Sequence, residues 1–329
     1  MGTHGVYFRH LGTPACEIQG GFASLSASFG TPQVLAGPPP GVSPLSPRRI
    51  APQSEPSSVS TSIPRRLVVH GAAGRMGQRI VACAAGDKAA SWQLVAAVER
   101  PGHERMGIDA GTLSGVGPVD VPITATWSCP ADVAIDFSLP GAVAGIAQAC
   151  VAARVPLVVA TTGLEAADRR AIEQAAGSIA VLQSPSMSLA VNIAMDLVGR
   201  AAALLARVGT RSDVEIIEVH HRHKEDAPSG TALKFGQIVQ DSLGFTRVAH
   251  GREGRPGARP ADEIGYHAVR AGDNPGEHTI LFGLDGEALS VNVRATSRDC
   301  YARGALAAAA FLIGRPAGLY SMRDVLGLA

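Results

Sequence analysis

The stretch LVVHGAAGRMGQRIVACAA, residues 67–85, decides the fold of this chain. It begins with a short apolar run, continues through glycines at Gly71, Gly74 and Gly77, and ends in a helical pattern. Glycines in such a turn allow a sharp reversal, close approach of backbone N–H groups to a pyrophosphate, and close packing of helix on strand. The helix N-terminus adds the positive end of its dipole. The stretch predicts the first unit of a dinucleotide-binding fold, although GxxGxxG spacing alone is also that of an ordinary tight turn.

The next predicted strand, residues 93–98, ends in Glu99 and Arg100. An acidic residue roughly 20 positions past the glycines is placed to bind the adenine ribose. Glu99 suits the 2′-hydroxyl of NAD, whereas Arg100 suits the 2′-phosphate of NADP. The pair leaves both NADH and NADPH open as cofactors, and both residues are also ordinary at the end of a strand.

Further apolar runs alternate with helical stretches along the next part of the chain. The runs are residues 133–137, 157–160 and 179–182, and the helical stretches lie near 141–153 and 165–176. Continuous apolar runs are typical of strands buried on both faces of a parallel sheet, and ligands bind beyond the carboxyl ends of such strands. The polar segments found there are Ser138, residues 161–163 and residues 184–187. They are candidates for the nicotinamide side of the site.

A second motif, HHRHKEDAPSGTA at residues 220–232, follows a long helical stretch and a predicted strand over residues 214–219. Its three histidines lack i, i+4 spacing and have no cysteine or carboxylate at ligand spacing, and Lys224 would oppose a divalent cation. We therefore expect no metal. Imidazoles beside an ammonium group suit an anionic substrate that must also accept a proton.

The end of this motif predicts a helix that begins near Thr231. Gly230 allows close backbone approach, and the Thr231 hydroxyl with the first-turn N–H groups can bind a carboxylate. Ser229 and Thr231 are also ordinary helix caps. Three later runs, near residues 264–270, 278–284 and 289–295, would complete a second sheet. The basic, glycine-rich residues 251–260 suggest a solvated connecting loop.

The first 64 residues hold ten of the 22 prolines and several serine clusters. Such a segment cannot bury enough apolar surface to offset its ordering entropy, so we expect a disordered N-terminal extension. A targeting segment or a misassigned translation start would explain the same composition.

The composition of the whole chain narrows its class and its partners. A net charge of +1 points to neither nucleic acid nor an anionic membrane as a partner. Five dispersed cysteines favour a reducing, cytoplasmic location. The longest apolar run, residues 305–313, is far shorter than the roughly 20 residues that cross a bilayer.

Together the motifs resemble those of the 4-hydroxy-tetrahydrodipicolinate reductase (dihydrodipicolinate reductase) family, from residue 67 to the C-terminus. EVHHRHKEDAPSGTA, residues 218–232, is the most specific part, supported by GAAGRMG at 71–77, AVER at 97–100, IDFS at 135–138 and MRDVL at 322–326. The resemblance implies an α/β protein with a Rossmann-like cofactor domain over residues 65–190, completed by helices in residues 299–329. It also implies an α+β substrate domain with a mixed sheet over residues 191–298, which assembles a homotetramer.

The resemblance also implies an oxidoreductase of lysine biosynthesis through diaminopimelate. NADH or NADPH would reduce a cyclic dicarboxylate, (2S,4S)-4-hydroxy-2,3,4,5-tetrahydrodipicolinate, to (S)-2,3,4,5-tetrahydrodipicolinate with loss of water. The matching positions make His220 and Lys224 the proton-transfer residues, and His221, Gly230 and Thr231 the substrate-binding residues. The cofactor-binding positions are Gly71, Ala72, Ala73, Gly74, Arg75, Met76, Glu99, Arg100, Ala160, Thr161, Thr162, Ser184, Pro185, Ser186 and Met187.

Three positions depart from the family pattern: Ala160 replaces the first glycine of GTTG, Ser186 replaces the usual asparagine, and Leu139 replaces an arginine of some members. The last two bear on cofactor preference and leave the proton-transfer cluster unaffected. The rival interpretations are a related NAD(P)-dependent dehydrogenase acting on another amino-acid-derived imine, and a non-catalytic dinucleotide sensor. The His/Lys cluster argues against the sensor, which would need no proton donor.

Overall fold

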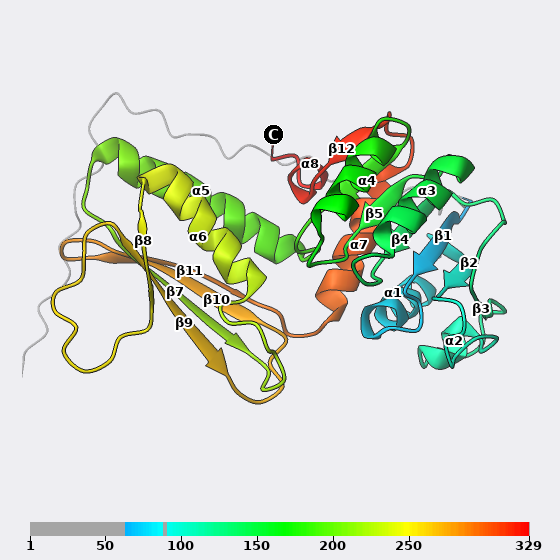
Figure 1. Cartoon of the computed structure of the whole chain (residues 1–329), viewed down its shortest axis with the longest axis horizontal. Coiled ribbons are helices and arrows are strands. Elements are labelled where there is room, and N and C mark those ends of the chain that lie inside the picture. Colours follow the sequence, from blue (N-terminus) through cyan, green and yellow to red (C-terminus); the bar gives the residue numbers. More distant parts are fainter. Residues whose placement is uncertain (1–62, 88–90, 329) are drawn as a thin grey trace, which may run out of the picture. The chain divides into compact units, whose positions relative to one another are not determined.

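The structure is a computed structural model that describes residues 63–87 and 91–328. The predicted extension over residues 1–64 therefore lies almost entirely outside the described residues. The described part holds two sheets, each with its own helices (Figure 1).

The first sheet is parallel throughout and has the strand order β12-β6-β5-β4-β1-β2-β3. Its strands are β1 (Arg65–His70), β2 (Trp92–Val98), β3 (Ile123–Thr124), β4 (Val133–Asp136), β5 (Leu157–Val159), β6 (Ala180–Gln183) and β12 (Gly318–Tyr320). The order of β1 to β6 is that of the doubly wound dinucleotide-binding fold. The apolar runs predicted as strands at 67–70, 93–98, 133–137, 157–160 and 179–182 are all found in it.

Helices cover both faces of this sheet. They are α1 (Arg75–Ala85), α2 (Ala110–Leu113), α3 (Val143–Ala153), α4 (Ala166–Ala176), α7 (Asp299–Leu312) and α8 (Met322–Val325). Alternate residues of a strand point to opposite faces, so Leu67 and Val69 pack in one core with α1 and α7. Val68 packs in the other core with α3 and α4. Helix α7, although it lies near the C-terminus, therefore packs on the sheet whose strand β1 begins the described chain.

The second sheet is mixed and has the order β11-β10-β7-β9-β8. Its strands are β7 (Asp213–His220), β8 (Arg247–His250), β9 (Glu263–Arg270), β10 (Glu277–Gly283) and β11 (Ala288–Arg294). Strand β7 pairs parallel with β9 and antiparallel with β10. Helices α5 (Leu189–Val208) and α6 (Gly230–Leu243) cover one face. The predicted fold class, a Rossmann-like parallel sheet plus a mixed sheet, is confirmed.

Burial along β7 alternates strictly between its two faces. Val214 and Ile216 are buried beneath α5 and α6, whereas Glu215 and Ile217 lie on the opposite face and are half-buried. In the part of the chain that is described, no helix covers this opposite face, which we call the open face. Side chains on the open face therefore contact loops or other molecules rather than a helix of the described part.

Helix α5 is the one described helix that is long and apolar enough to cross a membrane by length and composition alone. Its Val191, Ala194, Val198 and Ala202 are buried in the core shared with α6 and the second sheet. Core helices of this kind satisfy the same length and composition test, so the finding is weak support for a membrane span. The shorter run at residues 305–313 lies in α7 and at its C-terminal end.

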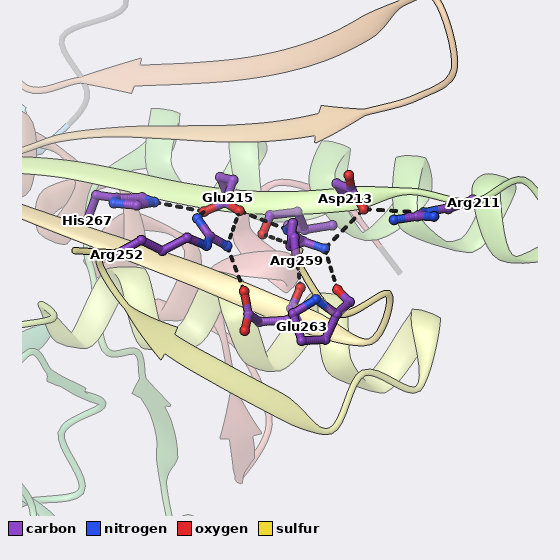
Figure 2. A network of polar contacts seen from close by, with 9 residues as sticks. Arg211, Asp213, Glu215, Arg252, Arg259, Glu263 and His267 are labelled. Carbon is purple, nitrogen blue, oxygen red and sulfur yellow. Dashed lines mark hydrogen bonds and ion pairs between the residues drawn. The ribbon is translucent and has the colours of Figure 1, made fainter. Parts of the chain in front are cut away.

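The loop between β8 and β9 is held on the open face by two arginines (Figure 2). Arg252 donates to Glu215 at 2.7 Å and to Glu263 at 2.6 Å. Arg259 donates to Glu215, to Asp213 and to the Val214 carbonyl, each at 3.0 Å. The expectation of a merely solvated loop was wrong for these residues, because both arginines are paired with carboxylates on the strands of the sheet.

Glu215 is the centre of this network, since it also bonds His267 at 2.7 Å. Burial alone would raise the pKa of Glu215, but hydrogen bonds from Arg252, His267 and Arg259 outweigh burial and lower the pKa to about 2. A carboxylate whose folded-state pKa is depressed contributes stability above its unfolded pKa of about 4.5, and that contribution is lost as the pH falls toward 2.

Replacing Arg259 tests this network. We expect Arg259→Ala to lower the free energy of unfolding at pH 7 by about 1–3 kcal/mol, because backbone carbonyls lose a charged donor and two carboxylates each lose one of their partners. The difference from wild type should shrink as the pH falls below about 4.5, because Glu215 of the unfolded chain takes up a proton there while Glu215 of the folded wild-type protein does not. Denaturant unfolding over this pH range measures both effects. Arg255→Ala, at an exposed position of the same loop, is the control; equal stability of the two variants would contradict the network.

Candidate active site

The turn between β1 and α1 leaves no room for side chains at two positions. A Cβ atom on Gly71, whose φ is +72°, would lie 2.6 Å from the Phe137 carbonyl oxygen. A Cβ atom on Gly77 would lie 2.1 Å from the Gly71 carbonyl oxygen. The backbone of this turn is therefore pressed against both β4 and helix α1. No side chain caps the N-terminus of α1, which begins at Arg75.

A cavity of about 940 Å³ opens at the carboxyl ends of β1, β2, β4 and β5. It includes the point between β1 and β4 where the direction of strand order reverses, which is where ligands bind in such sheets. Of the predicted cofactor residues, those that line it are Gly71, Gly74, Arg75, Met76, Glu99, Arg100, Ala160, Thr161 and Thr162. We call it the dinucleotide cavity.

Two alanines of the glycine turn lie behind this cavity wall. Ala72 and Ala73 are buried in the core beneath α1. The Ala72 N–H donates to the Val98 carbonyl at 3.1 Å, and the Ala73 N–H donates to Glu99 at 3.3 Å. Glu99 also accepts from the Arg100 N–H at 3.0 Å. These bonds fix the Glu99 carboxylate beside the glycine turn.

A second cavity of about 600 Å³ contains the His/Lys motif, and we call it the substrate-side cavity. All five residues predicted for proton transfer and substrate binding line it: His220, His221, Lys224, Gly230 and Thr231. Thr161 and Thr162 line both cavities, so the two spaces meet at the end of β5. The structure thus brings the two sequence motifs together.

The segment at residues 184–187 is only partly at this site. Pro185 lines the substrate-side cavity, whereas Ser184, Ser186 and Met187 are buried. The Ser184 hydroxyl donates to the Ser186 carbonyl at 2.8 Å, and Met187 packs in the core with α7. The turn after β6 therefore uses its hydroxyls to satisfy its own backbone.

Other residues that line the substrate-side cavity were not predicted from the sequence. They include Arg169 of α4, Gln183 of β6, Pro275 before β10 and Tyr301 of α7. In the sequence each of these stands among ordinary helix, strand or loop residues. Burial raises the pKa of Tyr301 to about 12, so this phenol stays protonated at neutral pH.

His220, His221 and Lys224 have distinct surroundings in this cavity. His220 is nearly buried at the end of β7, and its Nδ1 bonds the carboxylate of Glu218. Lys224 forms an ion pair with Asp226 at 2.8 Å. His221 Nδ1 is buried and has no hydrogen-bond partner among the described residues. Burial is the main cause that lowers the pKa of both histidines, so both favour the neutral form.

Helix α6 begins at Gly230 beside these side chains. Its cap is Ser229, whose hydroxyl accepts from the Ala232 N–H at 3.2 Å. Thr231, the other candidate cap, therefore keeps its hydroxyl for other contacts. The N-terminal end of this helix, with its partial positive charge, lines the cavity together with two imidazoles and an ammonium group. Such a cavity suits a small molecule with negative charge that takes up a proton.

Two family models match most of the described chain. "Dihydrodipicolinate reductase, N-terminus" matches residues 65–187, and "Dihydrodipicolinate reductase, C-terminus" matches residues 190–326. The chain belongs to the dihydrodipicolinate reductase family. The resemblance inferred from the motifs is confirmed.

Curated relatives in this family are close in sequence. The 4-hydroxy-tetrahydrodipicolinate reductase of Rhodopirellula baltica is 51% identical over 274 residues, covering 81% of this chain and 97% of the relative. That of Alkalilimnicola ehrlichii is 45% identical over 269 residues, covering 80% of this chain and 99% of the relative.

A solved structure has the same fold. It is a dipicolinate-bound dihydrodipicolinate reductase from Paenisporosarcina sp. TG-14, with a TM-score of 0.62 and 23% identity, covering 80% of this chain and 99% of that one.

Proposed function

We propose that this member of the dihydrodipicolinate reductase family reduces (2S,4S)-4-hydroxy-2,3,4,5-tetrahydrodipicolinate to (S)-2,3,4,5-tetrahydrodipicolinate with loss of water, a step of lysine biosynthesis through diaminopimelate. The observation that carries this proposal is the meeting of the two cavities at Thr161 and Thr162. A dinucleotide on one side and a cyclic dicarboxylate beside the His/Lys cluster on the other would place donor and acceptor in contact. The family and its named relatives support the same reaction.

A pyridine nucleotide fits the dinucleotide cavity. The glycine turn admits a pyrophosphate because no side chain stands at Gly71 or Gly74, and the uncapped N-terminus of α1 favours negative charge. The Ser138 hydroxyl is buried in the same cavity wall and has no partner among the described residues. Thr161, Thr162 and Ala160 then lie toward the nicotinamide, with Pro185 on the adjoining wall. The bound nucleotide supplies the hydride.

The proton comes from this chain's own residues. Loss of the 4-hydroxyl as water creates a conjugated cyclic imine, and adding hydride at C4 drives negative charge toward the ring nitrogen. One hydride and one proton complete the reduction. Lys224 is the proton donor, because its ammonium group lines the cavity that would hold the substrate. His220 lines the same cavity and assists proton transfer.

The substrate carboxylates have hydrogen-bonding partners apart from Lys224. Gly230 and Thr231 offer backbone N–H groups and a hydroxyl at the start of α6, and His221 adds an imidazole with an unpartnered nitrogen. The division into cofactor-binding residues 65–190 with 299–329 and substrate-binding residues 191–298 is supported by the packing of α7 in the core of the first sheet. The cytoplasmic location stays a prediction.

A homotetramer built through the open face of the second sheet is the assembly we propose. The open face carries a group of partly exposed apolar side chains: Ile217, Val219, Val269 and Leu281. Exposed apolar groups on an uncovered sheet face are typical of subunit interfaces. The Arg252/Arg259 network holds its loop on the same face, so this surface is shaped before subunits meet.

Replacing Lys224 tests the reaction. We expect Lys224→Ala to lower kcat by at least about 100-fold, because a positioned acid contributes on this scale, while Kd for NADH stays within about twofold. The assay follows nucleotide oxidation with substrate formed in situ from pyruvate and aspartate semialdehyde by the preceding synthase. Arg222→Ala is the matched control, since this nearby cation is exposed and lies outside the cavity lining. Full activity of the Lys224 variant would remove its assigned role.

Cofactor preference is tested by a pair of substitutions. Glu99→Ala should weaken the binding of NADH by about tenfold, because one charged hydrogen bond is lost. It should weaken the binding of NADPH less, because a 2′-phosphate repels this carboxylate. Arg100→Ala should weaken NADPH more than NADH. Steady-state KM values for both nucleotides in both variants measure the effect. Parallel losses for the two nucleotides would show that neither residue discriminates between them.

The assembly is tested at the centre of the open face. We expect Ile217→Asp to convert a tetramer into smaller species, because a carboxylate buried in an apolar interface is strongly unfavourable. Light scattering coupled to size-exclusion chromatography gives the mass. Leu204→Asp, at an exposed position on α5, is the control and should keep the wild-type mass. A monomeric wild-type protein would contradict the proposal.

A further inference from the structure

Glu218 lies at the centre of a buried polar cluster directly behind His220. It is fully buried on β7, on the face covered by α5 and α6. Both of its oxygens are occupied: Arg270 of β9 donates to each at 2.8 Å, and the Ser229 N–H donates to Oε1 at 3.0 Å. The remaining bond, to Oε2, comes from His220 Nδ1.

This arrangement keeps Glu218 ionised. Burial would raise its pKa, but the hydrogen bonds from Arg270 and His220 outweigh burial and lower the pKa. An ionised carboxylate is an acceptor only, so the shared proton at His220 belongs to Nδ1. The bidentate arginine also cancels the carboxylate charge, which limits how far Glu218 can favour an imidazolium.

The ring of His220 is confined from its other sides as well. His278 of β10 packs edge-on against it, with ring centroids 5.2 Å apart, and bonds the Ser229 hydroxyl through Nε2 at 3.1 Å. Burial lowers the pKa of His278 to about 4, so this neighbour stays neutral. Gly276 leaves space beside His220 Nε2, since a Cβ there would lie 2.9 Å from that nitrogen.

We propose that Glu218, clamped by Arg270, is a positioning residue that holds His220 as the Nδ1–H tautomer and presents an unprotonated Nε2 to the substrate-side cavity. This inference rests on the proposed function and deepens it by dividing the two proton-transfer roles. In this tautomer Nε2 can accept a hydrogen bond, and the proton delivered to substrate comes from Lys224. His220 is therefore an acceptor that orders the donor, the substrate or water.

The charged and titratable groups that face His220 come from five elements. They are Glu218 on β7, Lys224 in the loop after β7, Arg270 on β9, His278 on β10 and Tyr301 on α7. Among them Glu218 is the group whose loss moves His220 toward a lower pKa, because it alone stabilises the imidazolium. Removing Glu218 should therefore shift to lower pH any part of the pH dependence of kcat/KM that reports the titration of His220.

The tautomer is measured on the wild-type protein by long-range ¹H–¹⁵N correlation spectra of labelled histidine, with His220 assigned by its absence in His220→Gln. We expect the Nδ1–H pattern at neutral pH. An Nε2–H pattern or an imidazolium pattern in wild type overturns the inference. The spectra need no substrate, so they test the tautomer independently of activity. Failure of the wild-type protein to reduce the proposed substrate would reject the proposed function and leave the tautomer result unchanged.

The kinetic test uses Glu218→Gln. We expect kcat to fall by about 100-fold, Kd for NADH to stay within about twofold, and the tautomer signal to change. Arg270→Lys keeps the positive charge but loses the bidentate geometry, so we expect a smaller loss of kcat. This variant replaces Glu218→Gln as the test if Glu218→Gln does not fold. Glu215→Gln, which removes an arginine-bound carboxylate from the opposite face of the same strand, should leave the His220 tautomer unchanged. Wild-type tautomer and kcat in the folded Glu218 variant, or in Arg270→Lys, overturn the inference.

Discussion

The contact that the rest of the site depends on is the close approach of the Gly71 backbone to Phe137 on one side and to helix α1 on the other. Because no Cβ fits at Gly71 or Gly77, the end of β1, the end of β4 and the start of α1 converge on one small volume. That convergence opens the dinucleotide cavity and aims the α1 N-terminus into it. The Glu99 carboxylate is held there by the Ala73 N–H of the same turn.

The second half of the site is organised by charge compensation rather than by close backbone packing. Glu218 is fully buried, and an unpaired carboxylate there would be very unfavourable. Arg270 and the Ser229 N–H satisfy it, and they also tie β9 and the start of α6 to the end of β7. The same bonds that make the buried charge tolerable therefore bring His220 and the Gly230–Thr231 segment to one cavity.

Much of the fold was predictable because its signals are local. The runs at 67–70, 133–137 and 157–160 are almost wholly apolar, and their residue types alone predict strands that are buried on both faces of a parallel sheet. Strands β3 and β12 escaped prediction because two or three residues are too short to show a period. The same locality explains the recognition of residues 218–232, where the chemistry is contiguous in the chain.

Contacts between distant residues could not be read in this way. Arg259 and Glu215 are 44 positions apart, and Arg270 and Glu218 are 52 apart, so neither pair leaves a pattern in sequence. Ser184 and Ser186 are predicted to bind the cofactor because they follow a strand, and this stays a prediction; their hydroxyl groups bond nearby backbone. Only the folded backbone distinguishes a hydroxyl that faces a ligand from one that completes a turn.

The return of α7 and β12 to the first sheet has a consequence for biosynthesis of the chain. The sheet opens near residue 65 but gains its last strand and one covering helix only from residues 299–320. During translation the second sheet can be complete while one face of the first is covered by α1 and still lacks α7. We therefore expect the sheet that begins first to be the last to close, and a chain that stops before α7 to leave apolar surface in water.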